Sequence, residues 1–209
     1  MKNFFDTENK FWRLFGSFAD VLVLSLLWAI CCLPVVTIGA ASIALYDAAA
    51  KRIHEDEEHP YKHFFHVLRT ELLRGIGITV LWGLLAFLLT LGYSFLYQQG
   101  KTNSLAAMYS MVYLGSLLIP VSIFLWLLPV EARFAHGFWS LHKTAASFAF
   151  VHLPTTALLL VILAGCVILA GFLPVLIFFL PSIMVMLQST LVEKVFKKYI
   201  EEEPNDTAV

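Results

Sequence analysis

The sequence predicts an all-α, polytopic membrane protein with about six transmembrane helices and both termini in the cytoplasm. Of its 209 residues, 59% are hydrophobic and only 14% are charged, and the mean hydropathy is +0.79. A water-soluble globule of this length could not bury so much apolar surface. Apolar runs of membrane-spanning length recur along the chain, with the basic residues gathered between them. We therefore expect a single membrane domain over residues 1–199, multi-pass in the plasma membrane, and a disordered tail at 200–209.

The charge balance and the cysteines exclude some functions. A net charge of −1 argues against a nucleic-acid partner, which would need a basic face to meet phosphates. Cys31, Cys32 and Cys166 all lie in apolar runs. Their spacing suggests neither a disulfide framework nor a thiolate metal site, so we interpret them as small buried hydrophobes.

Five segments are long and apolar enough to cross a bilayer, which takes about 20 residues of helix. They cover residues 14–33, 76–97, 105–129, 154–173 and 175–192. Pro174 separates the last two and predicts a tight hairpin, because proline ends or kinks a helix. The first run lacks a clear small-residue cleavage site, so we expect an uncleaved span rather than a signal peptide.

Residues 35–52 are less hydrophobic than these five segments, and whether they form a sixth span must be decided from the charges. If they cross, every lysine and arginine except Lys101 falls on one side of the membrane; if they do not, the basic residues split ten against four. Basic residues accumulate on the cytoplasmic side, so the count favours six spans. Gly39, Ala40, Ala44 and similar small residues would let this helix pack closely inside the protein. The alternative is a re-entrant or interfacial helix.

Two connections on the cytoplasmic side are expected to form amphipathic helices. In residues 60–74, Phe64, Phe65, Leu68 and Leu72 are assigned to one face, which would lie along the membrane surface. Residues 131–150 interleave aromatic and basic side chains in a similar way.

Two carboxylates stand within the predicted spans, where charge is expensive and tolerated mainly for a reason. Asp20 is about two turns into the first span and Asp47 about one turn from the cytoplasmic end of the second. We expect them to bond to each other, to Tyr46, or to Arg13 and Arg52. The other hypothesis places both on a substrate or proton pathway.

The remaining motifs predict no catalytic residue, no cofactor and no metal ligand. His59, His63 and His66 could share one helical face, but no cysteine accompanies them, so no metal is assigned. The sequence holds no nucleophile elbow, phosphate-cradling loop or zinc-protease helix. We therefore expect a protein that is not an enzyme.

The first fifty residues resemble the YesL family, a group of bacterial membrane proteins catalogued as a domain of unknown function. The resemblance continues through "HFFHVLR" and "EARF". Ser25 departs from an asparagine that the family commonly has before "LLW". The residues that carry the resemblance are Phe11, Arg13, Asp20, Trp28, Leu33, Pro34, Thr37, Gly39, Ala40 and Tyr46.

The resemblance implies a non-enzymatic accessory role in carbohydrate uptake, because such proteins are generally encoded beside sugar importers of the ATP-binding cassette type. "EARFAHG" is similar to the E-A-A-x-x-D-G loop by which importer permeases dock on their ATPases. Glu131 matches that loop, whereas Arg133 and His136 depart from it; the alternative is an ordinary surface helix. Expected partners are the lipid bilayer and an importer permease or ATPase subunit. Two alternatives stay open: a small-molecule transporter or channel in its own right, and a homo-oligomer.

Overall fold

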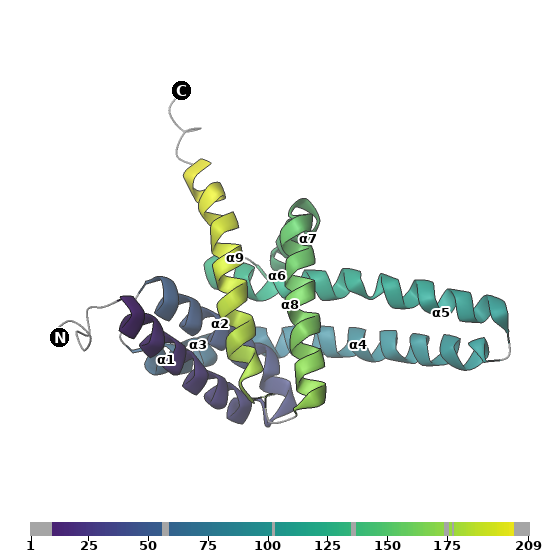
Figure 1. Cartoon of the computed structure of the whole chain (residues 1–209), viewed down its shortest axis with the longest axis horizontal. Helices are drawn as coiled ribbons and strands as arrows, with labels where there is room; N and C mark the ends of the chain where they lie inside the picture. Colours follow the sequence, from purple (N-terminus) through teal and green to yellow (C-terminus); the bar gives the residue numbers. More distant parts are fainter. Residues whose placement is uncertain are drawn as a thin grey trace.

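The computed structural model describes residues 10–55, 59–101, 103–134, 137–173, 176 and 178–202, and these residues form helices and no strand. The all-α class is therefore confirmed. The helices, labelled in Figure 1, are α1 (Lys10–Cys31), η1 (Val35–Thr37), α2 (Ile38–His54), α3 (Pro60–Thr70), α4 (Leu72–Gly100), α5 (Ser104–Ser116), α6 (Leu118–Arg133), α7 (Phe138–Val151), α8 (Leu153–Phe172) and α9 (Leu180–Glu202).

Helix α2 lies at the centre of the molecule. It packs against α1, α3, α4, α6 and α9, and apart from Ser42 every residue from Gly39 to Ala50 is buried. The small side chains of the segment allow this, because they let several helix backbones approach a single axis. Gly39 meets Gly75 of α4 so closely that a Cβ on either residue would collide with backbone of the other helix.

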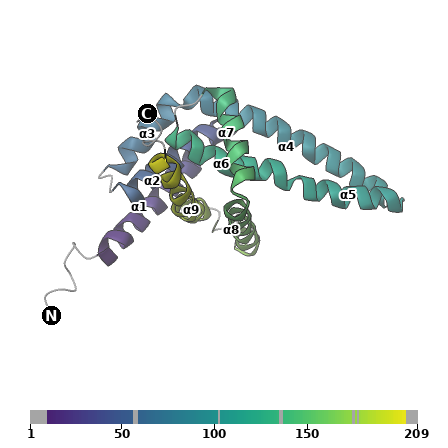
Figure 2. The ribbon, with the colours of Figure 1, turned by 90° about the horizontal axis from the view of Figure 1, so that it is seen from above.

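Helices α4, α5 and α6 form a long hairpin. Figures 1 and 2 both show α4 and α5 side by side, with their connecting turn far from the rest of the molecule. A break at Leu117 separates α5 from α6. Pro120 explains it, because proline has no amide hydrogen to donate to the carbonyl of Ser116, and its ring crowds that carbonyl.

Helices α8 and α9 form a second hairpin, which runs across the direction of the first in Figure 1 and is seen nearly end-on in Figure 2. The two hairpins diverge from a shared base built around α2. Ser182 of α9 ties this hairpin to α1 by donating a buried 2.9 Å hydrogen bond to the carbonyl of Val21.

Three helical stretches are long and apolar enough to cross a membrane by length and composition: Leu72–Gly100, Ser104–Arg133 (α5 with α6) and Leu153–Phe172. Few of their residues are buried: Gly75 and Ile78 in α4, Thr156 and Leu159 in α8, Ser110 in α5, and a group at the end of α6 that includes Trp126. Several long apolar helices with many exposed hydrophobic side chains indicate a membrane protein.

The other three predicted spans also contain helices. Segments 14–33 and 35–52 correspond to α1 and to η1 with α2, while α9 starts at Leu180, five residues after the predicted start at 175. Their membrane crossing, and thus the number six, stays a prediction. The disordered tail predicted at 200–209 is wrong at its start, because α9 continues to Glu202. Residues 203–209 lie outside the described residues.

The amphipathic helices α3 and α7 pack onto the core, but only some of the apolar side chains assigned to one face of α3 point toward it. Phe64 is buried against α2 and Leu68 is half-buried, but Phe65, assigned to the same face, is 46% exposed. Neighbouring residues on a helix point about 100° apart, so Phe64 and Phe65 cannot both face the core. In α7, Leu141, Ala145 and Ala149 are buried while Trp139 is 71% exposed.

Candidate functional site

Four carboxylates with little or moderate exposure form ion pairs that join separate helices. We call Asp20, Asp47, Glu131 and Glu193 the paired carboxylates; their side chains are 26%, 12%, 2% and 8% exposed. A carboxylate removed from water is costly unless a partner of opposite charge or several hydrogen-bond donors compensate it.

Asp20 connects α1 to both α2 and α3. Its Oδ2 accepts a 2.7 Å hydrogen bond from Arg52 Nε, and its Oδ1 accepts one of 2.7 Å from the hydroxyl of Tyr61. Burial, together with this hydrogen bond to the Asp20 carboxylate, raises the pKa of Tyr61 to about 12. The phenol therefore remains a donor at physiological pH.

Asp47 connects α2 to α3. Its Oδ2 lies 2.6 Å from His63 Nε2 and 3.6 Å from Lys51 Nζ, one turn further along α2. His63 is thus engaged with a carboxylate. Among the residues that the structure describes, no group of three histidines, cysteines or acids is placed to hold a metal ion.

Glu131 and Glu193 bind arginines from other elements. Glu131 Oε1 lies 2.6 Å from Arg74 NH1, which joins α6 to the start of α4. Glu193 Oε1 accepts a 2.7 Å hydrogen bond from Arg133 Nε, and the same arginine reaches Glu55 at 3.1 Å. Arg133 therefore links the end of α6 to α9 and to the residue that follows α2.

The structure separates some residues that the sequence grouped. Asp20 and Asp47 have different partners, and neither has a hydrogen bond or ion pair to Tyr46. The hydroxyl of Tyr46 is buried and finds no acceptor or donor in the described part of the chain. Of the two arginines proposed for Asp20, Arg52 is its partner, whereas the side chain of Arg13 lies outside the described residues.

Sequence reasoning missed Glu193, Tyr61 and His63 as partners in these contacts. Glu193 directly follows the apolar run 175–192, so extending the search for carboxylates by one residue would have found it. Nothing in the spacing of Tyr61 and His63 points to Asp20 and Asp47, because the contacts arise when α3 folds back on α2.

The segment compared with the importer docking loop is turned inward in part. Glu131 is almost fully buried and pairs with Arg74, and Arg133 forms ion pairs with two acids. His136 lies outside the described residues. The matching glutamate is thus engaged within the chain.

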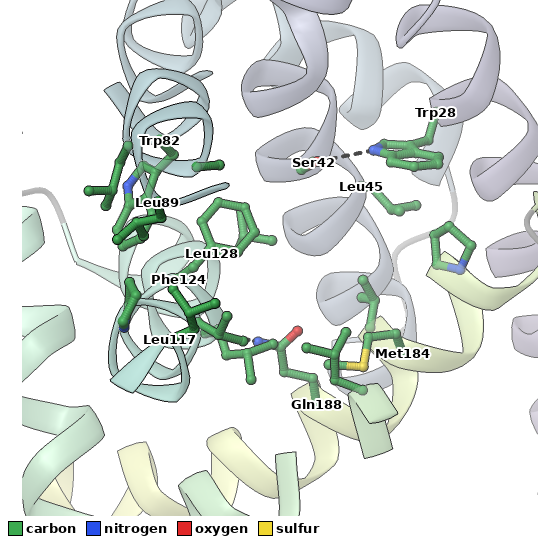
Figure 3. Close-up of a pocket in the computed structure, with 18 of the residues that line it drawn as sticks. Trp28, Ser42, Leu45, Trp82, Leu89, Leu117, Phe124, Leu128, Met184 and Gln188 are labelled. Atoms are coloured by element: carbon green, nitrogen blue, oxygen red, sulfur yellow. Dashed lines mark hydrogen bonds between the residues drawn. The ribbon is translucent and has the colours of Figure 1, made fainter. Parts of the chain in front are cut away.

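An apolar groove of about 580 Å³ opens beside α2, where the two hairpins diverge. In Figure 3, Trp82, Leu89 and Phe124 from the first hairpin face Met184 and Gln188 of α9 across a hollow. Trp28, Ser42 and Leu45 from α1 and α2 also line it (Figure 3). Neither Asp20 nor Asp47 belongs to its lining.

The comparisons with known proteins give one family match. Residues 21–93 match the family model described as "Protein of unknown function, DUF624". The YesL family is known as a DUF624 family, so the match confirms the resemblance stated from the first fifty residues. No curated protein and no solved structure matches the chain.

Proposed function

We propose that this chain, which matches the DUF624 family over residues 21–93, is a multi-pass protein of the cell membrane, with six crossings and both ends in the cytoplasm. In this role it serves as a non-enzymatic accessory component of carbohydrate uptake, in contact with a sugar importer of the ATP-binding cassette type. The carbohydrate context rests on the resemblance to the YesL family, and the importer is its proposed partner.

The ion pairs support a common cytoplasmic side for three connections. Arg133 after the fourth proposed span binds Glu193 after the sixth and Glu55 after the second. Arg74, before the third span, binds Glu131 after the fourth. Charged ends that pair directly with one another fit on the same side of a bilayer. Lys101, the one basic residue assigned to the opposite side, follows α4 at the distant turn of the first hairpin (Figure 1).

The observation that carries the accessory role is that the paired carboxylates all bind basic side chains of the same chain. A transport route for a polar solute needs polar groups facing a water-filled path. Asp20 and Asp47 instead join helices to one another, and the groove beside α2 is apolar. This arrangement supports a structural role for both aspartates over the alternative of an independent transporter.

Two helices present exposed faces that suit a partner. On α3, Lys62, Phe65, His66 and Arg69 share one helical face and all are exposed. On α7, Trp139, Lys143, Ser147 and Phe150 do the same. We call these the α3 outer face and the α7 outer face. Exposed aromatic and arginine side chains are the residue types that contribute most to protein interfaces.

Co-purification tests the proposal. A tagged chain, cross-linked in its native membrane, is expected to carry with it the permease or ATPase of a sugar importer, identified by mass spectrometry. Trp139→Ala and Phe65→Ala should reduce the recovered importer subunit, because each removes an exposed aromatic side chain. Lys194→Ala, which removes an exposed basic residue of α9, is the matched control and should leave recovery unchanged.

Two results would contradict the proposal. One is a chain recovered without any importer subunit, together with unchanged sugar uptake after the chain is deleted. The other is solute uptake by the purified chain alone in liposomes, lost in Asp20→Asn or Asp47→Asn, which would establish the transporter alternative.

A further inference from the structure

The groove beside α2 lies among helices suited to the hydrocarbon core of a membrane. Its walls include residues of α4, of the stretch formed by α5 with α6, and of α8. These are the three stretches that are long and apolar enough to cross a membrane. Nearby surface residues such as Leu84 and Leu118 are each 56% exposed and apolar. The hydrocarbon core of a bilayer supplies no water to an apolar hollow that opens to it, so we expect hydrocarbon or protein to fill the groove.

We propose that the groove holds one acyl chain of a bilayer phospholipid. The polar side chains of its lining support an apolar occupant, because each of them already takes part in a hydrogen bond within the protein. Trp28 Nε1 donates to Ser42 Oγ at 3.1 Å, and Gln188 Nε2 donates to the carbonyl of Leu125.

Trp82 and Thr90, which also line the groove, are engaged within the protein as well. Trp82 Nε1 donates to His142 Nε2 at 3.2 Å, and the Thr90 hydroxyl donates to the carbonyl of Ala86 at 2.8 Å. A sugar or another polar solute depends on a few well-placed polar groups for its orientation and affinity. Each polar side chain of the lining is thus engaged within the protein, and the rest of the lining is hydrophobic.

The size of the groove favours a lipid chain over a protein helix. One turn of helix with its side chains, 5.4 Å long and 10–12 Å wide, takes up roughly 420–610 Å³. The groove, at about 580 Å³, is comparable in size to about one turn, whereas a helix that crosses a bilayer has five or more. A slender hydrocarbon chain can enter the same volume lengthwise.

Brominated lipids provide the direct test. Bromine on an acyl chain quenches tryptophan fluorescence on contact, and two indoles, those of Trp28 and Trp82, line the groove. The full chain is reconstituted in vesicles of phosphatidylcholine brominated on its acyl chains, as variants that retain a single tryptophan. Trp28 and Trp82 should be quenched, whereas Trp126, which is fully buried, should not.

A groove-filling substitution separates a held lipid from the surrounding bilayer. Ala86 lies in the lining and Leu88, on the same helix, is 56% exposed and outside it. Ala86→Phe should relieve the quenching of Trp28 and remove the phospholipid that co-purifies in detergent, as measured by mass spectrometry. Leu88→Phe should change neither quantity.

Three outcomes would overturn the proposal. If Trp28 and Trp82 are not quenched in the unmodified groove, the hairpins close on each other in the bilayer and the groove does not exist there. If quenching and bound lipid persist in Ala86→Phe, the contact is with bulk lipid. If the chain purifies as a dimer and Ala86→Phe dissociates that dimer, the groove is covered by a second copy of the chain. None of these outcomes depends on an importer, so this proposal and the proposed function fail separately.

Discussion

At the scale of single residues, the paired carboxylates explain how charged groups are tolerated among apolar helices. Each carboxylate meets an arginine or histidine, and Asp20 also accepts a phenol hydrogen bond. A pair of this kind adds little net stability compared with two apolar residues, yet removing one member leaves an uncompensated charge. We therefore interpret these pairs as devices that set the relative positions of helices.

The Asp20–Arg52 pair yields a quantitative prediction. Asp20→Asn keeps the shape of the side chain but leaves Arg52 without its carboxylate, and should lower the free energy of unfolding by about 1–3 kcal/mol, because both groups are only partly exposed. Thermal unfolding in detergent measures the change. Glu71→Gln, which affects a longer contact of 3.8 Å to Arg74, is the control and should cost at most about 1 kcal/mol.

A double substitution decides whether the loss comes from the pair itself. If Arg52→Gln in the Asp20→Asn background costs less than Arg52→Gln alone, the two side chains are energetically coupled. Strictly additive losses would show that the short contact contributes no coupling.

At the scale of helices, the crossing of α2 and α4 depends on glycine. A Cβ on Gly75 would collide with backbone atoms of Ala40, which cannot move aside as a side chain could. Gly83, about two turns further along α4, has open space around it, because no neighbouring element of the described structure comes within 4 Å of where its Cβ would lie.

Alanine substitutions at these two glycines should therefore diverge. Gly75→Ala forces α2 and α4 apart and should destabilise the protein by about 1–3 kcal/mol. Gly83→Ala meets no neighbour and should be neutral or stabilising by up to about 1 kcal/mol, since alanine favours helix more than glycine. Unfolding of both variants in the same detergent is the measurement, and equal effects would contradict the close crossing.

At the scale of the whole molecule, the open question is sidedness. The proposal requires Lys101 outside and Arg69 inside, and both residues are exposed. In a chain whose three cysteines are replaced, Lys101→Cys should react with a membrane-impermeant maleimide in intact cells, while Arg69→Cys should react only after the membrane is permeabilised. Labelling of Arg69→Cys in intact cells would remove the crossing at residues 35–52, and with it the count of six.

The position of helix α2 could be predicted from the sequence more closely than the side chains that pair with one another. Helix α2 was placed within three residues at each end, because small residues between a proline and a charged loop leave few alternatives. Asp20 was expected to bond to one of several groups, of which Arg52 is its partner. Tyr61 and His63 could not be found, since their contacts depend on how α3 folds back.

Composition and the spacing of apolar runs alone determine that this chain is helical and suited to a membrane, because both properties follow from local backbone hydrogen bonding and side-chain transfer from water. The tertiary structure decided which charged side chains pair, that α2 packs against five other α-helices, and that an apolar groove opens where the hairpins diverge. These features depend on contacts between residues far apart in the chain, such as Ser182 with Val21 and Arg133 with Glu55, and no local pattern encodes them.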